Sequence, residues 1–113
     1  MYQVVKRDGK VVDFNISKIS AAITKAFDAL GKQYHPSVIE LLALHVTADF
    51  DQKIHDGKIT VEDIQDSVEK VLSESGYADV AKAYILYRKQ REKVRNVNSA
   101  LLNYKDLVDN YLQ

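Results

Sequence analysis

Residues 4–19 read VVKRDGKVVDFNISKI, and this stretch decides how the chain begins to fold. Two short runs of β-branched and aromatic residues flank Asp8-Gly9, a dipeptide that favours a two-residue hairpin turn because both positions tolerate positive φ. Asn15 and Ser17 then favour a helix start, since short polar side chains can cap the first free N–H groups of a helix. The stretch therefore predicts a β-hairpin that leads directly into a helix.

Apolar residues at helical spacing continue along the rest of the chain. They predict helices over residues 16–30, 36–50, 61–75 and 77–95. Gly31 favours the end of the first helix, and Thr60 followed by Asp63 resembles a capping box at the start of the third. Asp56-Gly57 breaks the chain, and Lys58-Ile59 is extended enough for a short third strand. The predicted fold class is mainly α with a small β cap: a four-helix bundle covered by the N-terminal hairpin and the third strand. In the second helix the expected inward positions are Val38, Leu41, Leu42, His45, Val46 and Phe50.

Composition narrows the class of protein. The chain has 113 residues, 46% of them apolar and 28% charged, which suits a single globular domain. It has no cysteine, so a disulfide scaffold, a thiol nucleophile and a cysteine-based metal site are excluded. Charges interrupt residues 1–15, and the most apolar stretch, residues 38–48, is too short to span a bilayer. These features predict a cytoplasmic domain without a membrane partner.

Charge is segregated although its sum is zero. Residues 1–27 carry a net charge of +3, residues 28–81 carry −7 and residues 82–95 carry +5. A net charge of zero argues against a general nucleic-acid binder, which needs an excess of Lys and Arg. Two basic segments around an acidic one fit a compact anionic ligand better. A small nucleic-acid-binding module that uses residues 82–95 as a basic helix is the alternative, and a helical scaffold without a ligand is a third.

Residue patterns for catalysis and metal binding are weak. His35, His45 and His55 lie ten residues apart, so surface or packed histidines are favoured over a metal site. Neither the phosphate-loop nor the dinucleotide glycine motif occurs. The sequence by itself therefore gives no case for catalysis.

The best chemical signal lies around the hairpin turn and the start of the first helix. Lys6, Arg7, Asn15 and Lys18 fall within thirteen residues. A helix N-terminus offers free N–H groups and a partial positive charge, so it stabilises an anion. The competing interpretation is a solvated turn with ordinary surface lysines.

Three ordered blocks carry a family resemblance. Residues 4–19, residues 57–65 (GKITVEDIQ) and residues 81–89 (AKAYILYRK) resemble the ATP-cone, a nucleotide-binding regulatory domain of many ribonucleotide reductases. The similarity covers residues 3–95, and the family's fold is the helical bundle under a β cap described above. The resemblance implies that the chain binds ATP or dATP as an allosteric effector, with Mg²⁺ held largely through phosphate oxygens and water.

The resemblance also implies roles for individual residues. Basic side chains would hold the phosphates, the hairpin loop would shape the backbone around the nucleotide, Asn15 would contact base or sugar, and the start of the third helix would line the base end. The implied nucleotide-binding residues are Val5, Lys6, Arg7, Asp8, Gly9, Asn15, Lys18, Thr60, Val61, Glu62, Gln65, Arg88 and Lys89.

Residues 1–95 are thus expected to form the cone, and residues 96–113 a connector helix toward a catalytic core that this chain lacks. Residues 101–112 look like the lead-in to the anaerobic, glycyl-radical class of reductase, and the aerobic class is the alternative. A zinc-ribbon transcriptional repressor that shares the cone is disfavoured, because it needs an N-terminal cysteine cluster and this sequence has no cysteine. The resemblance implies regulation of overall reductase activity, no catalysis by this segment, and a homo-oligomer in contact with the catalytic core.

Overall fold

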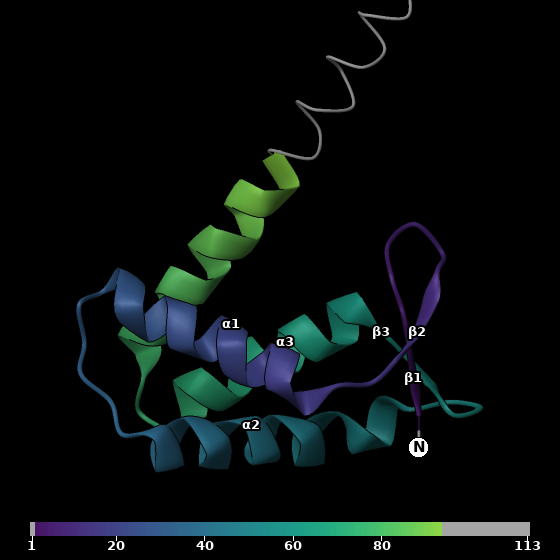
Figure 1. The fold of residues 1–113 in the computed structure, drawn as a ribbon, viewed down its shortest axis with the longest axis horizontal. Helices are drawn as coiled ribbons and strands as arrows, with labels where there is room; N and C mark the ends of the chain where they lie inside the picture. Colours follow the sequence, from purple (N-terminus) through teal and green to yellow (C-terminus); the bar gives the residue numbers. More distant parts are fainter. Residues whose placement is uncertain (1, 94–113) are drawn as a thin grey trace, which may run out of the picture.

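The computed structural model describes residues 2–93, and it is mainly helical with a small sheet at one end (Figure 1). The fourth helix occupies residues 78–93 of the described range, and the predicted connector over residues 96–113 lies outside that range. No helix among the described residues is long and apolar enough to cross a membrane. The remaining elements, in chain order, are β1 (Gln3–Val5), β2 (Val11–Asp13), α1 (Ile16–Ala29), α2 (Pro36–Phe50), a 3₁₀ turn (Asp51–Lys53), β3 (Lys58–Thr60) and α3 (Val61–Glu74). These elements confirm the predicted fold class.

The sheet has the strand order β2-β1-β3. β1 pairs antiparallel with β2, with Val4 opposite Val12, and it pairs parallel with β3, with Val4 opposite Ile59. Because β3 runs straight into α3, the parallel pairing brings the start of α3 beside the strand that enters the hairpin loop (Figure 1). The sheet therefore joins two segments that are distant in the sequence.

The hairpin loop differs from the predicted two-residue turn. Lys6 N donates to Lys10 O at 2.8 Å, and Gly9 N donates to Lys6 O at 2.9 Å, so the loop spans three residues. Gly9 has φ of 85°, whereas Asp8 keeps a negative φ. The Asp8 carboxylate accepts a hydrogen bond from Lys10 N at 3.0 Å, which satisfies that N–H without a two-residue turn. This is the bulged type of hairpin loop, in which one glycine supplies the positive φ.

Side-chain caps fix where three helices begin. Asn15 Oδ1 accepts from Ser17 N at 3.0 Å before α1, and Thr60 Oγ1 accepts from Asp63 N at 3.1 Å before α3, as the sequence predicts. Before α2 the cap is His35, whose Nδ1 accepts a backbone N–H at 3.1 Å. His35, for which the sequence favours a surface or packed position, therefore caps α2.

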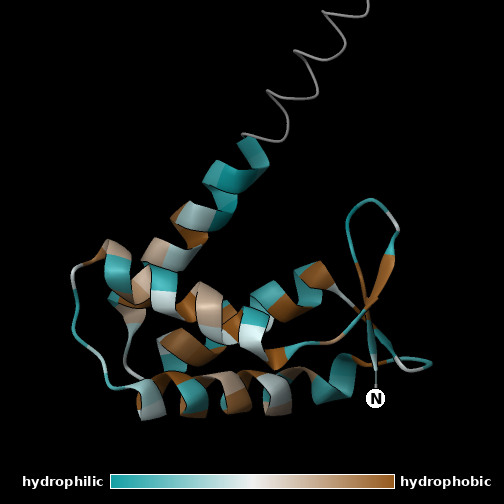
Figure 2. Cartoon of the chain, viewed as in Figure 1, coloured by the Kyte–Doolittle hydropathy of each residue, from teal (hydrophilic) through white to brown (hydrophobic). Residues whose placement is uncertain are grey.

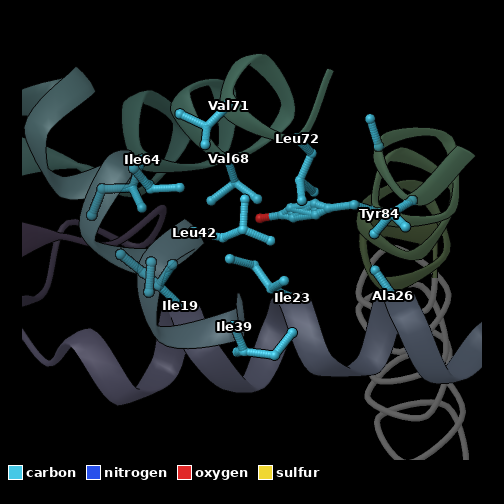
Figure 3. Close-up of a cluster of buried hydrophobic side chains, with 14 of the residues drawn as sticks. Ile19, Ile23, Ala26, Ile39, Leu42, Ile64, Val68, Val71, Leu72 and Tyr84 are labelled. Carbon is cyan, nitrogen blue, oxygen red and sulfur yellow. The ribbon is translucent and has the colours of Figure 1, made fainter. Parts of the chain in front are cut away.

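The core lies between α1, α2, α3 and the fourth helix, and it continues under the sheet. Figure 3 shows these side chains converging, with the Tyr84 ring pointing from the fourth helix toward Leu42 and Val68. The hairpin loop and the last turns of the fourth helix are hydrophilic (Figure 2). The buried apolar residues are Val4, Ile19, Ile23, Ala26, Phe27, Ile39, Leu42, Ala43, Val46, Phe50, Ile59, Ile64, Val68, Val71, Leu72, Val80, Ala81 and Tyr84.

The buried face of α2 is only partly the predicted one. Leu41 is 54% exposed and His45 is also exposed, while Ile39 and Ala43 are buried. α2 carries apolar residues around much of its circumference, so the pattern alone does not select one face. Packing against α1 and α3 selects the stripe that contains Ile39, Ala43 and Val46.

Candidate functional site

A cavity of about 610 Å³ lies where the hairpin, α1, α3 and the fourth helix meet. Its size falls within the range typical of small-molecule sites, roughly 300–1,000 Å³. Four elements contribute to its wall, so neither the hairpin nor the bundle alone could form it. The lining residues are Val4, Lys6, Arg7, Asp8, Val12, Asp13, Phe14, Asn15, Lys18, Ile19, Ala22, Val61, Ile64, Gln65, Val68, Tyr84, Tyr87, Arg88 and Arg91.

The cavity combines an apolar floor with a charged rim. Val4, Ile19 and Val68 are core residues that also face the cavity. Tyr84 joins them, and its burial raises the pKa of the phenol to about 12, so its hydroxyl stays neutral at physiological pH. Apolar walls with a few converging polar groups suit a ligand that has a flat apolar part and a charged part.

The structure brings eight of the thirteen predicted site residues to this cavity: Lys6, Arg7, Asp8, Asn15, Lys18, Val61, Gln65 and Arg88. The other five do not line it. Val5 follows Val4 in β1, so its side chain points to the opposite face of the strand. Thr60 caps α3, Glu62 contacts Arg7, and Gly9 and Lys89 are exposed.

Arg7 connects the hairpin loop to two helices. Its Nε lies 3.2 Å from Glu62 Oε1, and its Nη2 donates to Gln65 Oε1 at 3.2 Å, both on α3. Its Nη1 lies 3.9 Å from Glu92 Oε1 on the fourth helix. The guanidinium is therefore already engaged by carboxylates on two sides.

Arg88 is engaged more tightly. Its Nη1 donates to Glu69 Oε1 at 2.7 Å and to Asp66 Oδ1 at 3.1 Å, so it holds the fourth helix to α3. Partial burial acts to lower the pKa of Arg88, but the hydrogen bonds to Glu69 and Asp66 outweigh it and raise that pKa above its ordinary value. Arg88 therefore stays charged, and the carboxylates of Asp66 and Glu69 neutralise its positive charge.

Two lysines on the cavity wall leave positive charge uncompensated. Within residues 2–93, neither Lys6 nor Lys18 forms an ion pair. Lys18 lies in the first turn of α1, where its N–H donates to Asn15 O at 3.1 Å. The partial positive charge of the α1 N-terminus adds to the two ammonium groups. This side of the cavity is suited to an anion.

Sequence reasoning missed Tyr87 and Arg91, which line the cavity from the fourth helix. Arg91 Nη1 donates to Tyr87 Oη at 3.1 Å, and the Lys25 ammonium lies 5.7 Å from the Tyr87 ring centre. The hydrogen bond from Arg91 lowers the pKa of Tyr87 below its ordinary value. Tyr84, Tyr87, Arg88 and Arg91 follow the i, i+3, i+4, i+7 spacing of one helix face, which is the signal that could have found them.

Comparisons with known proteins give the family of the chain. Residues 2–93 match the ATP cone domain family. The chain is 44% identical over 101 residues to the ribonucleoside-diphosphate reductase subunit alpha of Chlamydia trachomatis, a match that covers 82% of this chain and 10% of that protein. It is 38% identical over 104 residues to the vitamin B12-dependent ribonucleoside-diphosphate reductase of Mycobacterium tuberculosis, covering 92% of this chain and 14% of the relative.

A third relative is the anaerobic ribonucleoside-triphosphate reductase of Haemophilus influenzae, at 35% identity over 103 residues, covering 88% of this chain and 14% of that protein. In these three comparisons the chain therefore spans about a tenth to a seventh of the relative's length. The family match covers all of the described residues and includes every element that lines the cavity. The chain belongs to the ATP cone domain family.

Proposed function

We propose that this chain is a regulatory domain that binds ATP and dATP and sets the overall activity of a ribonucleotide reductase, while catalysing no reaction itself. The observation that carries the proposal is the cavity, where basic side chains from the hairpin, α1 and the fourth helix converge above an apolar floor. The family match and the reductase relatives support it.

The cavity suggests how a nucleotide would lie. The phosphates would face Lys6, Lys18 and the N-terminus of α1, since these groups supply positive charge that no carboxylate within residues 2–93 pairs with. The base would lie on the apolar floor near Val61 and Gln65, at the start of α3. Asn15 would contact base or sugar through its amide nitrogen, because its Oδ1 already caps α1.

The predicted residues that do not line the cavity would support the residues that do. Gly9 would allow the loop conformation, Thr60 would fix the start of α3, and Glu62 would hold Arg7. Val5 would align the hairpin through its pairing in β1. Lys89, exposed beside Arg88, would reach phosphates only from the rim.

Magnesium would arrive with the nucleotide. Within residues 2–93 no group of three or more His, Cys, Asp or Glu side chains is arranged to hold a metal ion. Asp8 and Asp13 are the carboxylates that line the cavity. That donor set fits Mg²⁺, which keeps several waters and binds phosphate oxygens with one or two carboxylates.

Regulation would require ATP and dATP to favour different arrangements of the domain or of its assembly, because a ligand shifts an equilibrium only by its differential affinity. The two nucleotides differ by one 2′-hydroxyl. In the full-length protein the domain would contact the reductase catalytic core and change the mass of a homo-oligomer. Light scattering of that protein with ATP and then dATP measures the assembly.

The class of reductase is a separate part of the proposal. Residues 101–112 support the anaerobic class, as does the triphosphate reductase relative at 35% identity. The diphosphate reductases are the second candidate, since they include relatives at 43% and 44% identity. An assay of the full-length protein with ribonucleoside triphosphates and diphosphates, with and without oxygen, distinguishes the two.

Thermal stability of the 113-residue chain tests nucleotide binding. With Mg²⁺, ATP or dATP at a hundredfold excess over its dissociation constant should stabilise the fold by about 2.7 kcal/mol, because the ligand binds only the folded state. A short DNA duplex, titrated at two salt concentrations, is the control for the basic-helix alternative. An unchanged melting temperature at millimolar nucleotide, together with duplex binding that weakens steeply with salt, would contradict the proposal.

A further inference from the structure

The three arginines that line the cavity are not equally available to a ligand. Arg7 contacts Glu62 at 3.2 Å, and Arg88 contacts Glu69 at 2.7 Å. Among residues 2–93, Arg91 has no carboxylate partner, and its hydrogen bond is to the neutral hydroxyl of Tyr87 at 3.1 Å. Arg91 is the cavity guanidinium whose charge is least compensated.

Recruiting Arg88 to a phosphate would disturb the helix packing. Its Nη1 holds both Asp66 and Glu69, which are the charged contacts between α3 and this part of the fourth helix. A ligand that took Arg88 would leave those two carboxylates without their cation, which is costly above all for Glu69, whose side chain is only 25% exposed. Arg88 has only 21% of its side chain exposed, so it has little freedom to reorient.

Arg91 can be recruited at a lower cost. Its partner is the neutral phenol of Tyr87, which it contacts through one hydrogen bond at 3.1 Å and through the ring at 5.8 Å, so binding a phosphate breaks no ion pair of Arg91 among residues 2–93. A guanidinium has five N–H donors in a planar fork that matches two phosphate oxygens. Tyr87 uses one of these donors and holds the group at the cavity wall, which reduces the entropy lost on binding.

We propose that Arg91, positioned by Tyr87, is the guanidinium that binds the phosphates of the ligand, and that Arg88 instead holds the fourth helix to α3. This inference rests on the proposed nucleotide-binding function and names a residue that family resemblance does not assign. It divides the basic segment of the fourth helix into a ligand residue and a structural residue.

The test compares variants by calorimetric titration of the 113-residue chain with ATP, inorganic triphosphate and adenosine. Arg91→Ala should weaken binding of ATP and of triphosphate by about tenfold or more, as expected when a charge-assisted bidentate contact is lost. It should leave adenosine binding and the melting temperature unchanged. The matched control is Lys82→Ala, which removes the same charge from an exposed position of the same helix outside the cavity.

Arg88→Ala should behave in the opposite way. It should lower the melting temperature of the ligand-free chain, and folded protein should retain most of its affinity for triphosphate. Arg88→Lys, which keeps the charge, guards against a variant that fails to fold. If Arg88→Lys loses triphosphate binding while Arg91→Ala keeps it, the assignment of the two arginines is wrong.

A spectroscopic readout separates ligand contact from structural effects. Because the hydrogen bond and the positive charge of Arg91 lower the pKa of Tyr87, a phosphate bound to Arg91 should raise that pKa toward its ordinary value. Ultraviolet titration of tyrosine with and without inorganic triphosphate measures the change, and Tyr87→Phe identifies the signal. No change in Tyr87 with triphosphate bound overturns the inference while the proposed function stands; failure of the wild-type chain to bind ATP or triphosphate overturns both.

Discussion

At the scale of single residues, Tyr84 serves the core and the cavity together. It is 5% exposed, its ring lies among the buried side chains of Figure 3, and it also lines the cavity. Burial raises its pKa to about 12 because the charged phenolate would lose its hydration. Folding therefore favours the protonated form of Tyr84.

This shift predicts how stability depends on alkaline pH. The folded pKa of about 12 lies above the ordinary value of 10.0, so the contribution of Tyr84 is complete below pH 10 and is lost as pH rises toward 12. At 1.36 kcal/mol per pKa unit, the loss amounts to roughly 2–3 kcal/mol. Urea unfolding of wild type and Tyr84→Phe between pH 9 and about 12 measures it. A wild-type curve as flat as that of Tyr84→Phe would contradict the prediction.

The same scale shows what sequence could predict of the site. Lys6, Arg7 and Lys18 follow from local features, a hairpin loop and a helix start, and all three line the cavity. Arg91 is different, because its importance depends on which arginines the carboxylates of α3 already occupy. Those pairings join side chains far apart in the sequence, and no local pattern reports them.

At the scale of elements, the helix ends that local residues determine are the part that sequence predicts well. Asn15 and Thr60 cap the helices that they are predicted to start. The end of α1 is also as predicted, since Gly31 has φ of 62° and Lys32 N donates to Phe27 O at 3.1 Å. These features are local, whereas the buried face of α2 is selected by packing against α1 and α3, which the local sequence does not report.

Asn15 allows the stability of α1 to be separated from ligand binding. Asn15→Asp keeps an acceptor for Ser17 N and should keep the melting temperature, but it adds a negative charge to the start of α1, the helix end that the phosphates are proposed to face. Asn15→Ala removes the cap and should cost about 1 kcal/mol of stability. Thermal unfolding and ATP titration of both variants measure the two effects. Equal or tighter ATP binding by Asn15→Asp would show that phosphates do not approach the start of α1.

At the scale of the whole molecule, the site depends on how the sheet and the bundle are joined. The helix count, the hairpin and the third strand could be predicted from sequence, because each follows from spacing and turn residues. The parallel pairing of β1 with β3 could not, since either edge of the hairpin was open to a third strand. That pairing sets the start of α3 against the hairpin loop (Figure 1), and residues of both basic segments line the cavity beside it.

The parallel pairing of β1 with β3 also bears on the order in which parts of the structure form during folding. A hairpin closes within microseconds, whereas α1 and α2 separate β1 from β3 along the chain, and long-range strand pairing is slow. Arg7 and Gln65, which meet across this pairing, are 58 positions apart. We therefore expect the cavity to be completed late in folding, so that ATP binds the folded chain and not the transition state. Stopped-flow measurements should show ATP slowing unfolding while leaving the refolding rate unchanged; faster refolding with ATP would mean that the cavity forms early.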